Sequence, residues 1–169
     1  MPFSSNIDSS SISGNYSDSN AGGIYSNNDS DLNIQNSNIN DNTTDFINHN
    51  TYGGGISNYG PLTINNSNIN NNSAKYGGGL NIDTNPSLDI LLTNTNINNN
   101  TSSLNGGGIY FGDGVFFFDH CRFSGNSSGN VGGAIYQSGS VDQIFFDHIL
   151  FNNNHSGGSG GSIFITGGE

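Results

Sequence analysis

The feature that most constrains the fold of this chain is an internal repeat of about 28 residues. A short motif, an apolar residue followed by two variable residues and asparagine, occurs six times. Successive copies start 27, 30, 28, 26 and 28 positions apart. The apolar residues that start the six copies are Ile12, Ile39, Ile69, Ile97, Phe123 and Phe151. Because repetition at a fixed period of this length is typical of stacked structural repeats, we expect the chain to form one rod of repeated coils.

The copies share a pattern of apolar residues. In copies two to six, two apolar residues separated by one position precede the motif, and in all six copies a glycine-rich element that ends in an aliphatic residue follows it. In the fifth copy these segments lie around Phe116–Phe118, Cys121–Phe123 and Gly133–Ile135. Alternation with period two predicts strands with one buried face. Three short strands per 28 residues predict an all-β parallel solenoid. The six expected coils, in a single domain, are roughly 1–29, 30–59, 60–85, 86–113, 114–139 and 140–169.

The composition fits such a solenoid once residues are assigned to repeat positions. The chain has 32 Asn, 26 Gly and 25 Ser among 169 residues, which taken alone favours disorder. The repeat instead places Asn at one bend, Gly at one close approach and Ser in one small inward column. An amide offers both a donor and an acceptor and tolerates left-handed backbone, so we expect an internal ladder. The ladder residues are Asn15, Asn42, Asn72, Asn100, Asn126 and Asn154; the alternative is that they face solvent in turns.

The charge of the chain excludes some functions. The formal net charge is −11, and Lys75 and Arg122 are the only fixed positive charges. Binding to nucleic acid is therefore not expected, because phosphate contacts need a basic patch. No apolar run approaches the roughly 20 residues of a membrane span. Cys121, the only cysteine, is expected to act as a small buried side chain and not as a nucleophile.

Two motifs in the fifth copy resemble a known family. Phe123–Asn126 is Phe-Ser-Gly-Asn, and Gly132–Ile135 is Gly-Gly-Ala-Ile. These resemble the FxxN and GGAI repeats of chlamydial polymorphic outer-membrane proteins, and variants of both cover essentially the whole chain. The resemblance implies a right-handed, single-stranded parallel β-helix of the pectin-lyase-like superfamily, displayed on a surface in an adhesive or passenger role. Most copies have Ile where the bacterial motif has Phe, which indicates a different lineage.

We therefore expect a non-catalytic surface or extracellular scaffold, adhesin-like, that contacts carbohydrate or protein and needs no cofactor. No secretory signal is recognisable, and no distinct cap is seen. Both observations favour a fragment of a longer secreted protein, with end-to-end association through uncapped coils as another possibility. The alternative function is a polysaccharide-active lyase or hydrolase. Its carboxylates would come from Asp83, Asp113 and Asp142, whose simpler role is turn formation and solubility.

One group of residues has the chemistry of a metal site. Asp119-His120 and Asp147-His148 occupy the same column in adjacent coils, so each pair should lie about 5 Å from its copy. Two imidazoles and two carboxylates suit a divalent metal ion. The competing explanation is a generic polar bend, because Asp side chains commonly hydrogen-bond to nearby backbone.

Loops and sequons supply the remaining candidates. The second copy has a longer loop than the other copies, at 43–51. This segment is expected to protrude and offer Phe46, Ile47 and His49 for contact with a partner. Nine Asn-x-Ser/Thr sequons occur, and those inside the expected ladder would be poorly accessible. The better glycosylation candidates are Asn28, Asn71 and Asn99.

Overall fold

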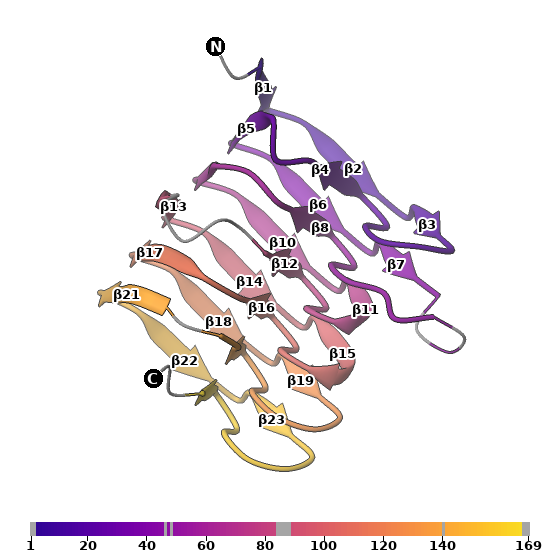
Figure 1. Ribbon diagram of the computed structural model, residues 1–169, viewed down its shortest axis with the longest axis vertical. Coiled ribbons are helices and arrows are strands. Elements are labelled where there is room, and N and C mark those ends of the chain that lie inside the picture. Colours follow the sequence, from indigo (N-terminus) through magenta and orange to yellow (C-terminus); the bar gives the residue numbers. More distant parts are fainter. Residues whose placement is uncertain (1–2, 46, 48, 84–88, 140, 167–169) are drawn as a thin grey trace.

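The computed structural model describes residues 3–45, 47, 49–83, 89–139 and 141–166, and within them the fold is a parallel β-solenoid (Figure 1). Its strands form four sheets of six strands each. Each coil contributes one strand to every sheet, and the chain makes five full turns between β1 and β21, the first and last strands of one sheet. No helix occurs in the described part of the chain, and so none is long and apolar enough to cross a membrane.

The sheets are named A to D in the order in which each coil enters them. Sheet A contains β1 (Phe3–Asp8), β5 (Ser30–Gln35), β9 (Leu62–Asn65), β13 (Asp89–Thr93), β17 (Gly114–Asp119) and β21 (Val141–Asp147). Sheet B contains β2 (Ser11–Ser13), β6 (Asn38–Asn40), β10 (Asn68–Asn70), β14 (Asn96–Asn98), β18 (Arg122–Ser124) and β22 (Leu150–Asn152).

The other two sheets complete each coil. Sheet C contains β3 (Tyr16–Ser17), β7 (Thr43–Thr44), β11 (Ser73–Tyr76), β15 (Thr101–Asn105), β19 (Ser127–Ser128) and β23 (His155–Ser156). Sheet D contains β4 (Ile24–Ser26), β8 (Ile56–Asn58), β12 (Leu80–Ile82), β16 (Ile109–Phe111), β20 (Ile135–Gln137) and β24 (Ile163–Ile165).

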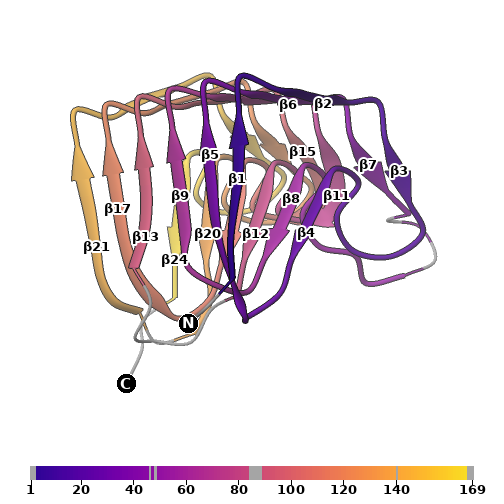
Figure 2. The same cartoon turned by 90° about the horizontal axis from the view of Figure 1, so that it is seen from above.

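Every strand pairs in parallel with its copy in the next coil, so equivalent residues stack. In sheet B, for example, Ile69 pairs with Ile39 on one side and with Ile97 on the other. Figure 2 shows the strands of sheet A running side by side across one face of the rod. This register converts each position of the repeat into a column of side chains along the axis.

The predicted fold class and the three predicted strands of each coil are confirmed, and sheet C adds a fourth strand. Its inward positions hold the small residues Thr44, Ala74, Ser102 and Ser128, all buried. Several of these strands have only two residues. A two-residue segment with one small inward side chain has no apolar alternation, which is why the sequence pattern did not reveal it.

The core is the column of inward apolar residues from sheets A, B and D. In the fifth coil Phe116, Phe118, Phe123 and Ile135 are fully buried. The terminal coils are covered on one side only, so their equivalents, such as Ile7, are partly exposed. The stacking of identical positions lets a thin coil bury its apolar side chains against two neighbours.

Left-handed backbone at three bends turns each coil. The first bend uses Ser9, Asn36, Asn66, Asn94, His120 and His148, with φ between 47° and 52°. The second uses Gly14, Asp41, Asn71, Asn99, Gly125 and Asn153, and the third uses Ala21 and five glycines from Gly53 to Gly160. The ladder asparagines themselves are not in this conformation. We expected the ladder asparagines to adopt left-handed backbone, and this was wrong. The left-handed residue is the one before each ladder asparagine, and the asparagine itself forms the hydrogen bonds between coils.

One repeat position holds glycine in all six copies, and in the first five of them close approach to the next coil explains it; the residues are Gly22, Gly54, Gly78, Gly107, Gly133 and Gly161. A Cβ atom at Gly78 would clash with the backbone oxygens of Thr101 and Gly107 in the neighbouring coil. The φ angle of Gly78 is not in the left-handed region. The column therefore requires glycine for space between coils.

Candidate functional site

The six predicted ladder asparagines form one continuous chain of hydrogen bonds along the rod. The Nδ2 of Asn72 donates to the Oδ1 of Asn100 at 3.0 Å, and its backbone N–H donates to the same oxygen at 2.9 Å. Its Nδ2 also donates to the carbonyl of Ile39 in the previous coil at 2.9 Å. The Oδ1 of Asn72 in turn accepts from both donors of Asn42. Both donors and both acceptor positions of the amide are therefore satisfied, which makes the column structural.

The two Asp–His pairs lie on the outside of the rod, at the bend between sheets A and B. The Nδ1 of His120 lies 2.5 Å from the Oδ1 of Asp119, and the Nδ1 of His148 lies 2.8 Å from the Oδ1 of Asp147. The two imidazole rings stack with centroids 4.4 Å apart and planes 17° apart. Both imidazoles are exposed, at 55% and 66%. The predicted column therefore brings all four side chains together.

Three side chains of this cluster lie close enough to bind one metal ion together. One ligand atom from each of Asp119, His120 and His148 lies within 4.8 Å of the others. In the previous coils the same two positions hold Asn65-Asn66 and Thr93-Asn94. Those residues form side-chain hydrogen bonds between coils, as from Thr93 Oγ1 to Asn65 Oδ1 at 2.9 Å. In the last two coils the imidazoles thus take the place of the polar side chains that hydrogen-bond at this bend in earlier coils.

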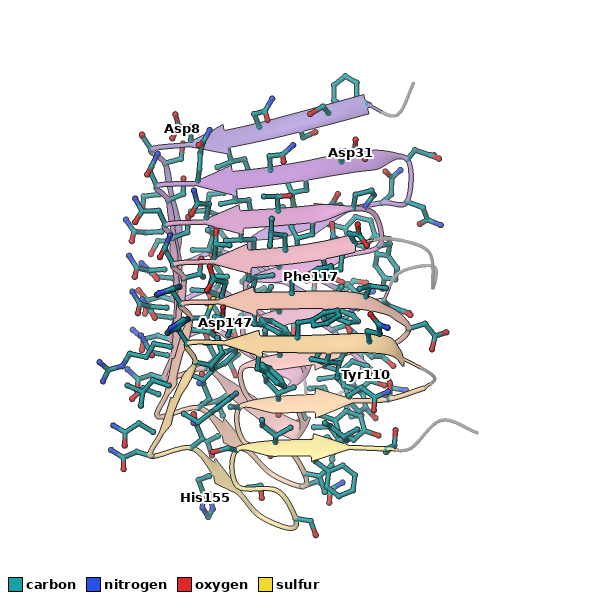
Figure 3. The ribbon with its side chains drawn as sticks, turned by 90° about the vertical axis from the view of Figure 1, so that its left-hand side faces the viewer. Asp8, Asp31, Tyr110, Phe117, Asp147 and His155 are labelled. Carbon is teal, nitrogen blue, oxygen red and sulfur yellow. The ribbon has the colours of Figure 1, made fainter. Side chains whose placement is uncertain are left out.

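A cluster of aromatic rings, here called the tyrosine face, covers the outside of sheet D. Tyr110 is its centre: its ring lies 5.6 Å from that of Tyr76, 5.9 Å from that of Tyr52 and 5.1 Å from that of Tyr136. The rings of Tyr52 and Tyr76 stack at 4.9 Å, and Phe164 extends the row beyond Tyr136 at 5.9 Å. In Figure 3 Tyr110 lies on the right-hand side of the rod, away from Asp147 on the left.

One polar side chain of sheet D is buried in its outward column. Asn81 occupies this column between Ser57 and Tyr110, yet it is only 1% exposed. Its Nδ2 lies 3.4 Å from the Oγ of Ser57, whereas its Oδ1 is buried without a hydrogen bond to any described residue. Because this amide is enclosed, the groups that a ligand can reach on the tyrosine face are the rings and their hydroxyls.

The rings are desolvated by their packing. Partial burial, followed by the proximity of Tyr110 and Tyr76, raises the pKa of Tyr52 and of Tyr136 above the ordinary tyrosine value. Burial also raises the pKa of Tyr59, whose ring lies 5.6 Å from that of Tyr25. The phenols of Tyr52, Tyr59 and Tyr136 are therefore neutral hydrogen-bonding groups at neutral pH.

Two of the three carboxylates considered for catalysis lie near the tyrosine face. Partial burial raises the pKa of Asp83, and the neighbouring charge of Asp113 raises it further. The side chain of Asp142 lies outside the described part of the structure. Asp83 and Asp113 are thus close enough to interact electrostatically.

The long loop of the second coil is shorter than predicted. Thr44 and Thr51 are buried and bonded to each other, from Thr44 Oγ1 to Thr51 Oγ1 at 2.8 Å, so they close the base of the loop. Ile47 is 80% exposed, and the Nδ1 of His49 lies 3.3 Å from the Oδ2 of Asp45. Phe46 lies outside the described residues. A binding role for this loop stays a prediction.

The remaining candidates lie as follows. Asn28, Asn71 and Asn99 are exposed, and their glycosylation stays a prediction. Cys121 is buried, and desolvation raises the pKa of its thiol to about 11. That environment is the opposite of the one that activates a cysteine nucleophile.

Comparison with known proteins finds similarity in the last two coils. Residues 120–138 and 148–166 each match the Chlamydia polymorphic membrane protein repeat. Searches of curated proteins and of solved structures gave no match. The chain is a parallel β-helix repeat protein that resembles the chlamydial repeats. Each matched segment begins at the histidine of the first bend and ends just after the third strand position that we predicted from the sequence.

The tyrosine face is the feature that the sequence reasoning missed. Its rings come from two positions of the repeat, one before the paired glycines and one after the aliphatic residue that follows them. Tyr52 and Tyr76 hold the first position, and Tyr110, Tyr136 and Phe164 hold the second. Neither position is aromatic in every copy, but listing aromatic residues by repeat position would have revealed both.

Proposed function

We propose that this chain is a non-catalytic, surface-displayed rod that contacts carbohydrate through its tyrosine face. Similarity to a membrane-protein repeat supports the surface location, and the fold supports the role of scaffold. The observation that carries the ligand class is the cluster of aromatic rings around Tyr110, which extends over successive coils.

Rings and polar groups of this kind match the chemistry of a sugar. The C–H bonds on one face of a sugar ring carry partial positive charge and pack on the negative face of an aromatic ring. The hydroxyls at the edge of the sugar need donors and acceptors, which the tyrosine hydroxyls provide. Because the rings recur from coil to coil, the face suits an extended chain of sugars more than a single residue.

The test is a glycan array followed by titration calorimetry with the glycans that bind. Replacing the central ring, in Tyr110→Ala, should weaken binding by about tenfold or more, since buried aromatic anchors dominate contact surfaces. Tyr16→Ala is the matched control, because Tyr16 is an exposed tyrosine on sheet C. Absence of any bound glycan, or equal loss in the control, would overturn the proposal.

A second candidate, polysaccharide hydrolysis, is favoured by the electrostatic contact between Asp83 and Asp113 beside the same face. Glycosidases use one carboxyl group with a raised pKa as an acid and a second, ionised one as base or nucleophile. Assays for new reducing ends on any polysaccharide that binds distinguish the two functions. Hydrolysis that disappears in both Asp83→Asn and Asp113→Asn would establish the enzyme.

A further inference from the structure

We propose that the stacked pairs Asp119-His120 and Asp147-His148 bind a divalent transition-metal ion such as Zn²⁺. The ion would be held by the two imidazoles, with the carboxylates fixing the rings. This site is separate from the tyrosine face and does not depend on the proposed carbohydrate contact. Its four side chains come from two adjacent coils at the same bend.

The orientation of the two rings is set by the aspartates. Each histidine directs its Nδ1 toward the carboxylate of the residue before it. An Nδ1–H bonded to a carboxylate leaves the Nε2 lone pair available, which is the usual arrangement behind a metal-bound histidine. The two ring centroids lie 4.4 Å apart, so each ring brings one such nitrogen to the same small region of the surface.

The two rings must turn before both imidazoles can share an ion. Two nitrogens that each lie about 2.0–2.1 Å from a tetrahedral Zn²⁺ are about 3.3 Å apart, and the ion lies near the plane of each ring, whereas the stacked rings direct their lone pairs in parallel. Both side chains are more than half exposed, which leaves them room to rotate until the two nitrogens converge on the ion. Water would complete the coordination, because the Asp119 carboxylate is held at the Nδ1 edge of His120.

The surrounding charge also favours a cation. The chain carries a net charge of −11, and two aspartates lie in the cluster itself. Arg122 follows two residues after His120 in β18 and is exposed. The carboxylates of Asp119 and Asp147 outweigh this single positive charge, and solvent screens it.

The chain provides its own guide to conservative variants. His120 and His148 have φ of 50°, and Asn66 and Asn94 have φ of 50° and 47° at the same bend in earlier coils. Asparagine therefore fits this backbone, and His120→Asn and His148→Asn should fold normally. His155→Asn is the control, because His155 is an exposed histidine in β23 on a different sheet.

The experiment is calorimetric titration of the purified chain with Zn²⁺, and separately with Ni²⁺, with circular dichroism melts of each variant. We expect one ion per chain, affinity reduced about tenfold or more in each of the two His→Asn variants, and no change in His155→Asn. Asp147→Asn should weaken binding by about 10- to 100-fold, as is usual for a partner of a ligating histidine. Absence of binding to folded wild type, or loss of binding in His155→Asn alone, would overturn the proposal.

Discussion

The outer column of sheet A is polar in the first three coils, with Asn6, Asn33 and Thr63, and apolar in the last three, with Leu91, Phe117 and Phe145. All five strand pairings of this sheet are parallel, and only the last, between β17 and β21, has a register shift, between Gly114 and Val115. Phe117 and Phe145 stack at 4.8 Å on the outside, where Phe145 is exposed; Phe117 is labelled in Figure 3 near the middle of that sheet. The two halves of the rod thus present different surfaces on the same scaffold.

The core differs between the halves in the same way. Positions filled by Ile34 and Ile64 in the second and third coils are filled by Phe118 and Phe146 in the fifth and sixth. Both matches to the chlamydial repeat lie in this aromatic half. What stays constant is the set of bends, the glycine column and the asparagine ladder. The comparison teaches that these constant columns specify the coil, whereas the other columns are free to vary in chemistry.

Breaking a constant column should have the largest effect. Asn100→Leu removes the acceptor for two donors of Asn72 and the donor to the carbonyl of Ile69 and to the Oδ1 of Asn126. Four buried hydrogen bonds are lost, at about 0.5–1.5 kcal/mol each, so we expect a loss of roughly 2–6 kcal/mol. Urea unfolding followed by circular dichroism measures it. Asn15→Leu, in the exposed first coil, should cost much less, and equal costs would contradict a buried ladder.

Exchanging core residues between the halves should have an intermediate effect. Phe118 contacts the rings of Phe116, Phe123 and Phe146, so Phe118→Leu leaves a gap that we expect to cost about 1–2 kcal/mol. The reverse change, Ile64→Phe, should cost about 1–3 kcal/mol by overpacking. Thermal unfolding tests both variants. A neutral result for either exchange would show that the core does not distinguish Ile from Phe at this position in the two halves.

The stability of Asp83→Asn at different pH values tests the region where the two halves of the rod meet. Asp83 in the third coil has a pKa raised above 3.8 by partial burial and by Asp113. Because the folded state disfavours the charged form, Asp83 lowers stability above its raised pKa and contributes nothing below about pH 4, where it is protonated in both states. The variant should therefore melt slightly higher than wild type at pH 7 and equally at pH 3. A difference that persists at pH 3 would contradict this origin.

The smallest effect is expected from Cys121→Ser. The same column holds Ser37, Ser67 and Thr95, whose hydroxyls donate to the carbonyl two residues earlier at 2.7–2.8 Å. Serine should form the same bond to Asp119 that the Cys121 thiol forms at 3.4 Å, with a change below about 1 kcal/mol. Since the thiol pKa is about 11, alkylation of the native chain at pH 8 should be slow and should accelerate on unfolding. Rapid alkylation of the folded chain would contradict the burial.

The parts of the fold that could be predicted are those with a bulky or invariant residue at a fixed position. Ile69 and Gly78 are examples, because each recurs as the same type of residue in every coil. Sheet C could not be predicted, since Ser102 and Ser128 are small polar residues that occur in loops just as often.

The candidate sites divide in the same way. The Asp–His column was predicted because its residues are adjacent in sequence and recur one coil later. The tyrosine face was missed because its rings, such as those of Tyr76 and Tyr110, come from two different repeat positions, neither of which is aromatic in every copy. That these rings meet, at 5.6 Å, follows only from the stacking of coils.

The asparagine ladder gives the rod a direction. In each of the first five coils the Nδ2 donates to the Oδ1 of the next coil, from Asn15 to Asn42 and finally from Asn126 to Asn154. The series therefore starts with an acceptor, the Oδ1 of Asn15, and finishes with a donor, the Nδ2 of Asn154. Any further coil that continues it, from the same chain or from another, must arrive head to tail. Aligned amides also polarise one another. The acceptor end of the column therefore binds only a donor, and the donor end binds only an acceptor.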